Sequence, residues 1–182
     1  MWCSPFTRPT LKLAQTLSSP IRLAVHASCL AEYDLQDQVH AINVAAARLA
    51  REVAAAYSTG AKPRFVAGSL GPQTKTISVT GGITFDEVMA AFYTQVLGLL
   101  EGGVDLLLIE TAQDTLNLKA TMLGAQRAMR EAGHHRASDD FWHHRGYGHD
   151  AGGQSIEALY TSVAHFQPLV YWSQLYHWAR SS

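Results

Sequence analysis

Residues 34–133 alternate between long amphipathic stretches and short, almost wholly apolar runs, and this alternation constrains the fold more than any other feature. Apolar positions recur every three or four residues, as in helices, in three stretches, at 34–57, 84–101 and 114–132. The runs at 64–70 and 104–109 have the length and composition of buried strands. Helices and strands that alternate at this spacing predict parallel strands with right-handed crossovers, in an α/β layer or barrel.

Local signals indicate where these helices begin and end. Thr84 and Glu87 form a capping box, and Gly102 follows that helix as its stop. Asp114 precedes the third helix and is interpreted as its cap rather than as a ligand. Asp34 is the expected cap of the first helix. The predicted buried stripe of that helix consists of Leu35, Val39, Ile42, Ala46, Leu49, Val53 and Tyr57.

Composition and charge exclude several classes of partner. The formal net charge is -1 and no basic stripe occurs, so we expect no nucleic-acid partner. No run approaches the roughly 20 apolar residues that a membrane span requires, so we expect no membrane partner. Cys3 and Cys29 have no paired spacing, which is typical of a reducing compartment. A soluble, cytoplasmic protein is therefore predicted.

The two flanks of the alternating region lack its pattern. Residues 1–30 combine prolines and apolar residues without a sustained period, and they are predicted to be irregular. After the third helix a buried strand is expected, but residues 134–153 are polar and rich in histidine. A helical stripe returns at 155–166 and is lost again afterwards. Such a conflict between local pattern and architecture needs an explanation.

Several motifs in order resemble the homocysteine-binding domain of cobalamin-dependent methionine synthases, in the homocysteine S-methyltransferase family. They are NVAAARLAR at 43–51, FVAGSLGP at 65–72, ITFDE at 83–87, EGGVDLLLIET at 101–111 and QDTLNLKA at 113–120. The resemblance covers residues 31–133 and returns at 153–159; the loop at Thr80, Gly81 and Gly82 is shorter than is usual in the family. It implies an α/β fold that is a partial TIM (β/α)8 barrel, incomplete at both ends. The expected divisions are 1–30, 31–133 and 134–182, the last a partly scrambled continuation of the same domain.

A shift of reading frame would explain both flanks. With permitted codons, residues 1–16 read in another frame can give V-V-F-T-I-H-Q-A-Y-F-E-A-G-A-D. Residues 137–153 can give M-I-S-G-T-I-A-G-M-G-T-T-L-A-G, and residues 170–182 can give Y-I-G-L-N-C-I-T-G-P-D. All three peptides resemble family segments that belong at those places. We therefore interpret the chain as a family fragment whose flanks are out of frame, a hypothesis that the gene's nucleotide sequence can decide.

The resemblance also implies a reaction and its cofactors. The family transfers a methyl group to homocysteine to form methionine, with the sulfur bound to zinc that three cysteine thiolates hold. Methylcobalamin on a separate module is the methyl donor, and folate- and cobalamin-binding modules are expected in a full-length relative. One zinc cysteine would fall near Leu175 and Tyr176, where none occurs, and the other two would lie beyond Ser182. Cys3 and Cys29 match none of them, so we predict no metal ligands, no catalytic residues and no activity in this chain.

Glu110 is the predicted substrate-binding residue. It follows the apolar run at 104–109, at the strand end where barrels of this type place their active sites. By resemblance, a glutamate here helps to hold the amino group of homocysteine. The alternative is a carboxylate that caps a neighbouring helix or faces solvent. The turn at Gly71 and Pro72 lies at the same predicted edge and is interpreted as residues that end the strand and begin a loop.

Two other classes of function stay open. The histidine-rich segment could bind a divalent metal, because imidazole is a common ligand of zinc, copper and nickel. Its members are His134, His135, His143, His144 and His149, whose spacing matches no closed zinc pattern. The third possibility is a non-catalytic interaction module that uses exposed faces of the incomplete barrel.

Overall fold

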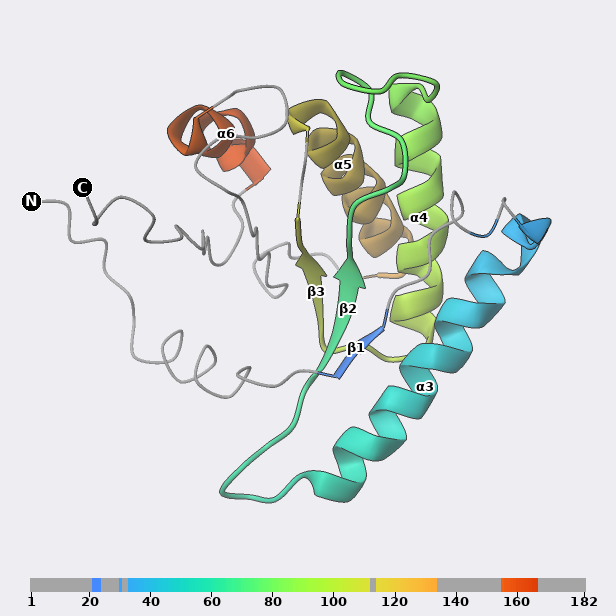
Figure 1. The fold of residues 1–182 in the computed structure, drawn as a ribbon. Coiled ribbons are helices and arrows are strands. Elements are labelled where there is room, and N and C mark those ends of the chain that lie inside the picture. The colour runs from blue at the N-terminus through green and yellow to red at the C-terminus, as the bar shows by residue number, and fades with distance from the viewer. Residues whose placement is uncertain (1–20, 24–29, 31–32, 112–113, 134–154, 167–182) are drawn as a thin grey trace, which may run out of the picture.

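A computed structural model describes residues 21–23, 30, 33–111, 114–133 and 155–166. Three strands form a parallel sheet in the order β1-β2-β3 (Figure 1). They are β1 (Ile21–Leu23), β2 (Val66–Leu70) and β3 (Leu106–Ile109). The sequence prediction of an α/β protein with parallel strands is therefore confirmed.

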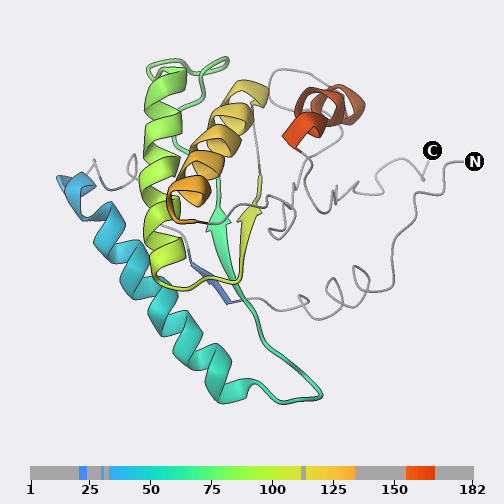
Figure 2. The ribbon, with the colours of Figure 1, turned by 180° about the vertical axis from the view of Figure 1, so that it is seen from behind.

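Helices alternate with the strands along the chain. They are η2 (Gln36–Gln38), α3 (Val39–Tyr57), α4 (Phe85–Glu101), α5 (Thr115–Glu131), α6 (Ile156–Val163) and η4 (Ala164–Phe166). Helix α4 packs between α3 and α5, and α4 and α5 lie behind the sheet in Figure 1 and in front of it in Figure 2. Each strand lies next to the preceding one in the sheet, always on the same side of it. Crossover connections between parallel strands are right-handed, so successive helices lie on the same face of the sheet.

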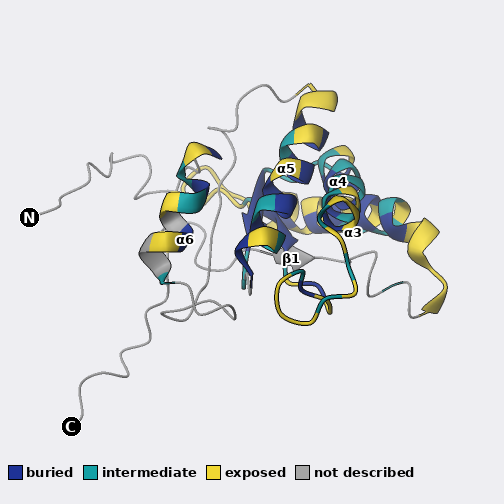
Figure 3. Cartoon of the chain, turned by 90° about the horizontal axis from the view of Figure 1, so that it is seen from above, coloured by how far each residue is buried: buried dark blue, intermediate teal, exposed yellow. Residues whose placement is uncertain are grey.

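The core lies between this face of the sheet and the helices. All residues of β2 and β3 are buried, as expected for parallel strands, and Figure 3 shows buried and exposed residues alternating along the helices. The sheet contributes Leu70, Leu107 and Ile109 to the main cluster; the helices contribute Val88, Phe92, Val96, Leu99, Leu118, Met122, Ala125 and Met129. Each large apolar side chain buried in this way stabilises the fold by about 1.5–3 kcal/mol.

Local capping signals predicted the ends of α4 and α5 correctly. The Thr84 hydroxyl accepts from the Glu87 N–H at 3.3 Å, and Glu87 accepts the Thr84 N–H at 2.8 Å, so both halves of the capping box are present. Asp114 caps α5 by accepting the Leu116 N–H at 2.7 Å. Gly103, just past α4, has a φ of +87°, a conformation that glycine adopts at little cost.

The predicted start of the first long helix is wrong, and its predicted stripe is fully buried only at Val39. Helix α3 begins at Val39, and Asp34 does not cap it but has a φ of +55°. The predicted stripe residues Leu49, Val53 and Tyr57 are exposed. The buried positions of α3 are instead Val39, Asn43, Val44, Ala47, Ala50 and Ala54.

Close packing against α4 explains this choice of face. The Cα of Gly98 in α4 approaches α3 so closely that a Cβ there would lie 2.6 Å from the carbonyl oxygen of His40. Small side chains on α3 allow this approach, whereas the larger Leu49 and Val53 would hold the helices apart. Dispersion attraction is effective only at short range, so the closely packed arrangement is the more stable one. For this reason α3 packs its alanine face against α4.

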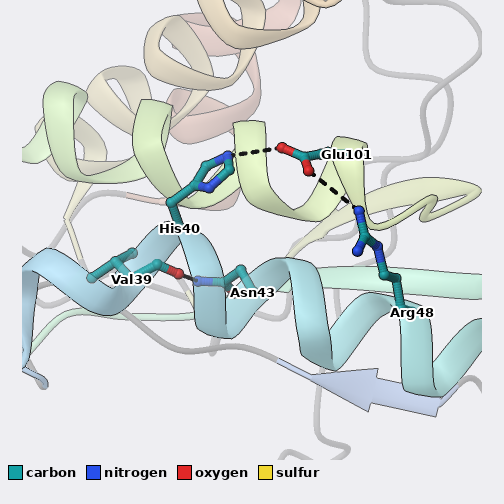
Figure 4. A network of polar contacts seen from close by, with 5 residues as sticks. All are labelled: Val39, His40, Asn43, Arg48 and Glu101. Atoms are coloured by element: carbon teal, nitrogen blue, oxygen red, sulfur yellow. Dashed lines mark hydrogen bonds and ion pairs between the residues drawn. The ribbon is translucent and has the colours of Figure 1, made fainter.

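Polar contacts lie beside the interface of α3 and α4, but they do not determine how the two helices pack. Glu101 at the end of α4 lies 3.4 Å from His40 Nε2 and 3.3 Å from an Arg48 nitrogen (Figure 4). The Asn43 amide donates to the Val39 carbonyl within α3 at 2.7 Å. Ion pairs as exposed as those of Glu101 contribute at most about 1 kcal/mol, so packing decides the arrangement.

Strand β1 and helices α6 and η4 lie in the two flanks of the alternating region. Strand β1 falls within residues 1–30 and pairs in parallel with β2, Ile21 opposite Val66. The prediction of wholly irregular structure there is corrected at these three residues, which are too few for a sequence period to show. The predicted helix at 155–166 is confirmed as α6 and η4, with Ser155 as cap and Leu159 and Val163 buried.

In the described part of the chain, no helix combines the length and the apolarity that crossing a membrane requires.

Candidate functional site

The candidate site lies where β2 and β3 end. Leu70 and Ile109 form the last pair of the two strands, and the Glu110 N–H donates to the Leu70 carbonyl at 3.2 Å. Glu110 therefore follows β3 directly, beside the turn at Gly71 and Pro72 that follows β2 (Figure 1). Parallel α/β folds place their ligand sites at this edge.

A hydrogen bond from Ser69 holds the Glu110 carboxylate. The Ser69 hydroxyl in β2 donates to Glu110 Oε1, and Ser69 is buried while Glu110 is half-buried. The Ser69 carbonyl accepts from Gln95 Nε2 at 3.1 Å, and Gln95 in α4 is fully buried. A chain of polar contacts therefore runs from α4 through β2 to the residue after β3, and it fixes where the charge of Glu110 lies.

The loop between β2 and α4 is clamped to the start of α5. Besides capping α5, Asp114 accepts the N–H of Ser78 at 2.6 Å and its hydroxyl at 3.1 Å. Asn117 accepts the Ile77 N–H at 2.8 Å and donates to the Lys75 carbonyl at 3.1 Å. Because α5 follows Glu110 in the chain, these contacts tie the loop after β2 to the segment after β3.

A pocket of about 330 Å³, counting the open solvent at its mouth, lies beneath this loop. Its lining includes apolar groups from both strand ends and both helices, and polar groups from the loop and α5. The lining residues are Leu70, Gly71, Pro72, Gln73, Thr76, Phe92, Ile109, Glu110, Asn117, Leu118 and Thr121. Glu110 is the charged residue of this lining, so the pocket favours a ligand with a small cationic group.

The backbone beside Glu110 is strained. Thr111 has a φ of +57°, in the left-handed region that β-branched residues rarely enter. Such strain costs on the order of 1–3 kcal/mol and is found mainly where function constrains the chain.

The described residues offer no set of side chains that fits zinc. No three His, Cys, Asp or Glu residues lie together among those that the structure describes. Cys3, Cys29, the histidines at 134–149 and the position near Leu175 lie outside the described residues. The predictions of a missing zinc site and of a metal-binding histidine segment therefore stay predictions.

The structure thus brings Glu110, Gly71 and Pro72 to one edge, as the predicted strands imply. Asp114 is a cap as predicted, and its second role as loop clamp was not foreseen. Sequence reasoning missed Ser69, Gln73, Gln95 and Asn117. A signal existed for Gln95, a glutamine on the apolar face of a helix; the partners of Asn117 become visible only in the fold.

A parallel α/β layer with a carboxylate at the carboxyl edge of its strands, beside a loop-covered pocket, is an architecture that enzymes use for small ligands. The model of the family described as homocysteine S-methyltransferase matches residues 19–173. The chain belongs to the homocysteine S-methyltransferase family, which confirms the resemblance seen in its motifs.

The curated relatives are much longer than the matched segment. Methionine synthase of Mycobacterium leprae (strain TN) is 41% identical over 108 residues, which are 59% of this chain and 9% of the relative. Methionine synthase of Mycobacterium tuberculosis (strain ATCC 25618 / H37Rv) is 39% identical over 108 residues, again 59% and 9%. This chain is thus similar to a small part of each relative.

A solved structure shares the fold. The apo crystal structure of the homocysteine methyltransferase MmuM from Escherichia coli matches with a TM-score of 0.55 and 21% sequence identity. The match covers 75% of this chain and 49% of that chain. At this identity the likeness shows the fold alone.

Proposed function

We propose that this chain is a homocysteine-binding domain of the methionine synthase type, in which Glu110 holds the ammonium group of homocysteine. The observation that carries the proposal is the placement of Glu110 at the end of β3, bonded by Ser69 and lining the pocket. Family membership supplies the substrate class. The hydrogen bond from Ser69 already fixes the conformation of this half-buried carboxylate. Binding of an ammonium group therefore costs little further side-chain entropy.

The pocket lining suits the rest of the amino acid. Leu70, Phe92 and Leu118 offer apolar contact to the methylene groups of homocysteine, while Asn117 and Thr121 supply polar atoms at the same pocket. Burial of each methylene group contributes about 0.8 kcal/mol. The pocket can therefore bind the methylene and amino-acid groups of homocysteine without activating its sulfur.

We also propose that the chain alone binds homocysteine without methylating it. In a complete relative, zinc would supply the thiolate form of the sulfur, and methylcobalamin on a further module would supply the methyl group that gives methionine. The described residues hold no set that fits zinc. We propose folate- and cobalamin-binding modules as partners in a full-length relative, and the cytoplasm as the compartment.

For the architecture, we propose part of a TIM (β/α)8 barrel, with residues 31–133 as its regular portion and 134–182 as a partly scrambled continuation. Sequential strand order with helices packed in a row supports it. For the flanks we propose a shifted reading frame. Sequencing of the gene tests this, because codons that cannot encode the family-like peptides in any frame would refute it.

Titration calorimetry with L-homocysteine, kept reduced, tests the substrate proposal. The wild-type chain is expected to bind, and Glu110→Gln is expected to bind at least about tenfold more weakly, since a charge-assisted hydrogen bond contributes about 1.5–3 kcal/mol. Glu101→Gln, an exposed glutamate on α4, is the matched control and should bind as the wild type does. Equal affinity in all three proteins would contradict the role of Glu110.

A second assay tests the proposed inactivity. The purified chain is incubated with homocysteine and methylcobalamin, and methionine is measured by mass spectrometry. No methionine is expected above a protein-free blank. Turnover by the chain alone would overturn this part of the proposal while leaving the binding role of Glu110 in place.

A further inference from the structure

The side chain of Gln73 is buried in the pocket lining, and no described residue forms a hydrogen bond with its amide group. Gln73 is 6% exposed, and neither its Nε2 nor its Oε1 has a hydrogen-bond partner among the residues that the structure describes. Gln95 differs, because its Nε2 donates to Ser69. Buried amide groups are nearly always paired, so a glutamine that lines a pocket with both ends of its amide unpaired is a candidate for binding a ligand.

The loop around Gln73 is built to hold this position. Pro72 restricts the backbone immediately before it. Two residues farther on, the Lys75 carbonyl is bonded by Asn117. The Thr76 N–H donates to the Thr80 hydroxyl at 2.8 Å, and Thr76 is buried. These contacts fix the loop on both sides of Gln73 in the sequence, so its side-chain amide is held in the pocket.

The chemistry of the lining identifies which ligand group the amide would take. Glu110 and Gln73 line the same pocket, and none of the described lining residues is a cation. An α-amino acid carries an ammonium and a carboxylate on one carbon atom. If the ammonium lies on Glu110, the carboxylate lies close by and needs a neutral donor, because the lining supplies no positive charge.

We propose that Gln73 Nε2 donates to the α-carboxylate of the amino acid whose ammonium Glu110 holds, so that Gln73 selects for amino acids over simple amines. This inference rests on the proposed function and assigns the second half of the same site. A primary amide offers two N–H donors, and hydrogen bonds to a charged acceptor are stronger than those between neutral groups.

Three ligands separate the two contacts. L-homocysteine carries both groups, 3-aminopropanethiol lacks the carboxylate, and 4-mercaptobutyrate lacks the ammonium. By calorimetry on the full chain, Gln73→Met is expected to weaken homocysteine and 4-mercaptobutyrate binding about tenfold and to leave 3-aminopropanethiol unchanged. Glu110→Gln should weaken homocysteine and 3-aminopropanethiol and leave 4-mercaptobutyrate unchanged.

A second variant tests the charge of the bound group. Gln73→Glu keeps the shape of the side chain and places an anion where the amide was. It is expected to weaken homocysteine binding more than Gln73→Met does, and to keep or strengthen binding of 3-aminopropanethiol. Parallel losses for both ligands would overturn the assignment of Gln73 to the carboxylate.

Stability without ligand supplies a readout that is independent of binding. Because Gln73→Met removes an unpaired buried amide, the ligand-free variant is expected to melt at a higher temperature than the wild type. A lower melting temperature would show that the amide is satisfied within the protein, and would overturn the premise.

The two proposals fail in different ways. If the wild-type chain binds homocysteine and Glu110→Gln weakens it while Gln73→Met does not, the function stands and the role of Gln73 is refuted. If the wild-type chain binds none of the three ligands, the proposed function is refuted, and the inference about Gln73 falls with it.

Discussion

The hydroxyl of Ser69 donates to the carboxylate of Glu110 across the ends of two neighbouring parallel strands. The two residues are 41 positions apart in sequence, and the pairing of Leu70 with Ile109 brings them together. The strand register thus determines which side chain of β2 can orient the carboxylate that follows β3.

Removal of the Ser69 hydroxyl tests whether this orientation matters for binding. Ser69→Ala is expected to weaken homocysteine binding about five- to tenfold, because the carboxylate loses a donor worth about 1 kcal/mol or more. Calorimetry measures the change. Thr94→Ala is the matched control, since it removes a hydroxyl that bonds the Ala90 carbonyl on α4, and it should bind as the wild type does. Equal weakening in both variants would contradict a specific role for Ser69.

The loop clamp at Asp114 predicts a combined loss of stability and loop order. Asp114→Ala leaves the Leu116 and Ser78 N–H groups without their acceptor, and is expected to lower the free energy of unfolding by about 2–4 kcal/mol. Urea denaturation measures this loss. Trypsin should also cleave faster after Lys75, whose backbone the clamp holds near α5.

Asp86→Ala controls for loss of a carboxylate in a first helical turn, because Asp86 lies exposed at the start of α4. It should change stability and cleavage far less than Asp114→Ala. If Asp114→Ala leaves the cleavage rate after Lys75 unchanged, the loop is held by other contacts.

The close approach of α3 and α4 predicts that Gly98 tolerates no side chain. In a free helix an alanine would be favoured over glycine by about 1 kcal/mol. At Gly98 its Cβ would lie 2.6 Å from the His40 carbonyl oxygen and 3.1 Å from Asn43 Cβ, so the helices must separate. We expect Gly98→Ala to destabilise the fold by about 1–3 kcal/mol in urea denaturation.

Gly60→Ala is the control for this substitution, because no atom of the described residues lies within 4 Å of a Cβ there. Its stability should stay within about 0.5 kcal/mol of the wild type. A Gly98→Ala protein as stable as the wild type would show that α3 does not pack this closely on α4.

The capping box predicts a pH dependence at the start of α4. Hydrogen bonds from the Thr84 N–H and hydroxyl hold the pKa of Glu87 below its usual value near 4.5. A carboxyl group whose pKa is lower in the folded state contributes stability that is fully present above its unfolded pKa. That contribution is lost as the pH falls through the folded pKa.

Thermal melts at a series of pH values below about 5 measure this contribution. The wild type should lose stability more steeply with acidification than Glu87→Gln, which keeps the shape of the cap without its titration. Glu52→Gln, an exposed glutamate on α3, should retain the steep dependence. Identical pH profiles for the wild type and Glu87→Gln would refute the contribution of the capping box.

Much of the secondary structure could be predicted because its signals are local. Thr84, Glu87 and Asp114 satisfy backbone N–H groups within a few residues of themselves, so their roles can be inferred from adjacent sequence. The two apolar runs become β2 and β3 because only a sheet covered by helices buries such runs completely. The place of Glu110 at a strand end follows from the end of the second run.

Predictions that depended on contacts between elements were less successful. The first helix presents one face with larger apolar residues, including Leu49 and Val53, and another with alanines, and its own period cannot choose between them. The choice depends on Gly98 in α4, 55 positions after Asn43, which only the fold brings into contact. A three-residue strand such as β1 is likewise specified by its neighbour β2 rather than by its own pattern.

The sequence by itself determined the order of helices and strands from α3 to α5, the caps of α4 and α5, the family, and the candidate carboxylate. These depend on short-range chemistry and on motifs that lie within single segments. Only the tertiary structure decided which face of α3 is buried, that Ser69 orients Glu110, and that Asp114 and Asn117 clamp the loop. It also decided that Gln73 is buried without a hydrogen-bond partner in the described part of the chain. The physical reason is that hydrogen bonds and packing act over a few ångströms, and strand pairing and helix crossing decide which distant residues come within that range.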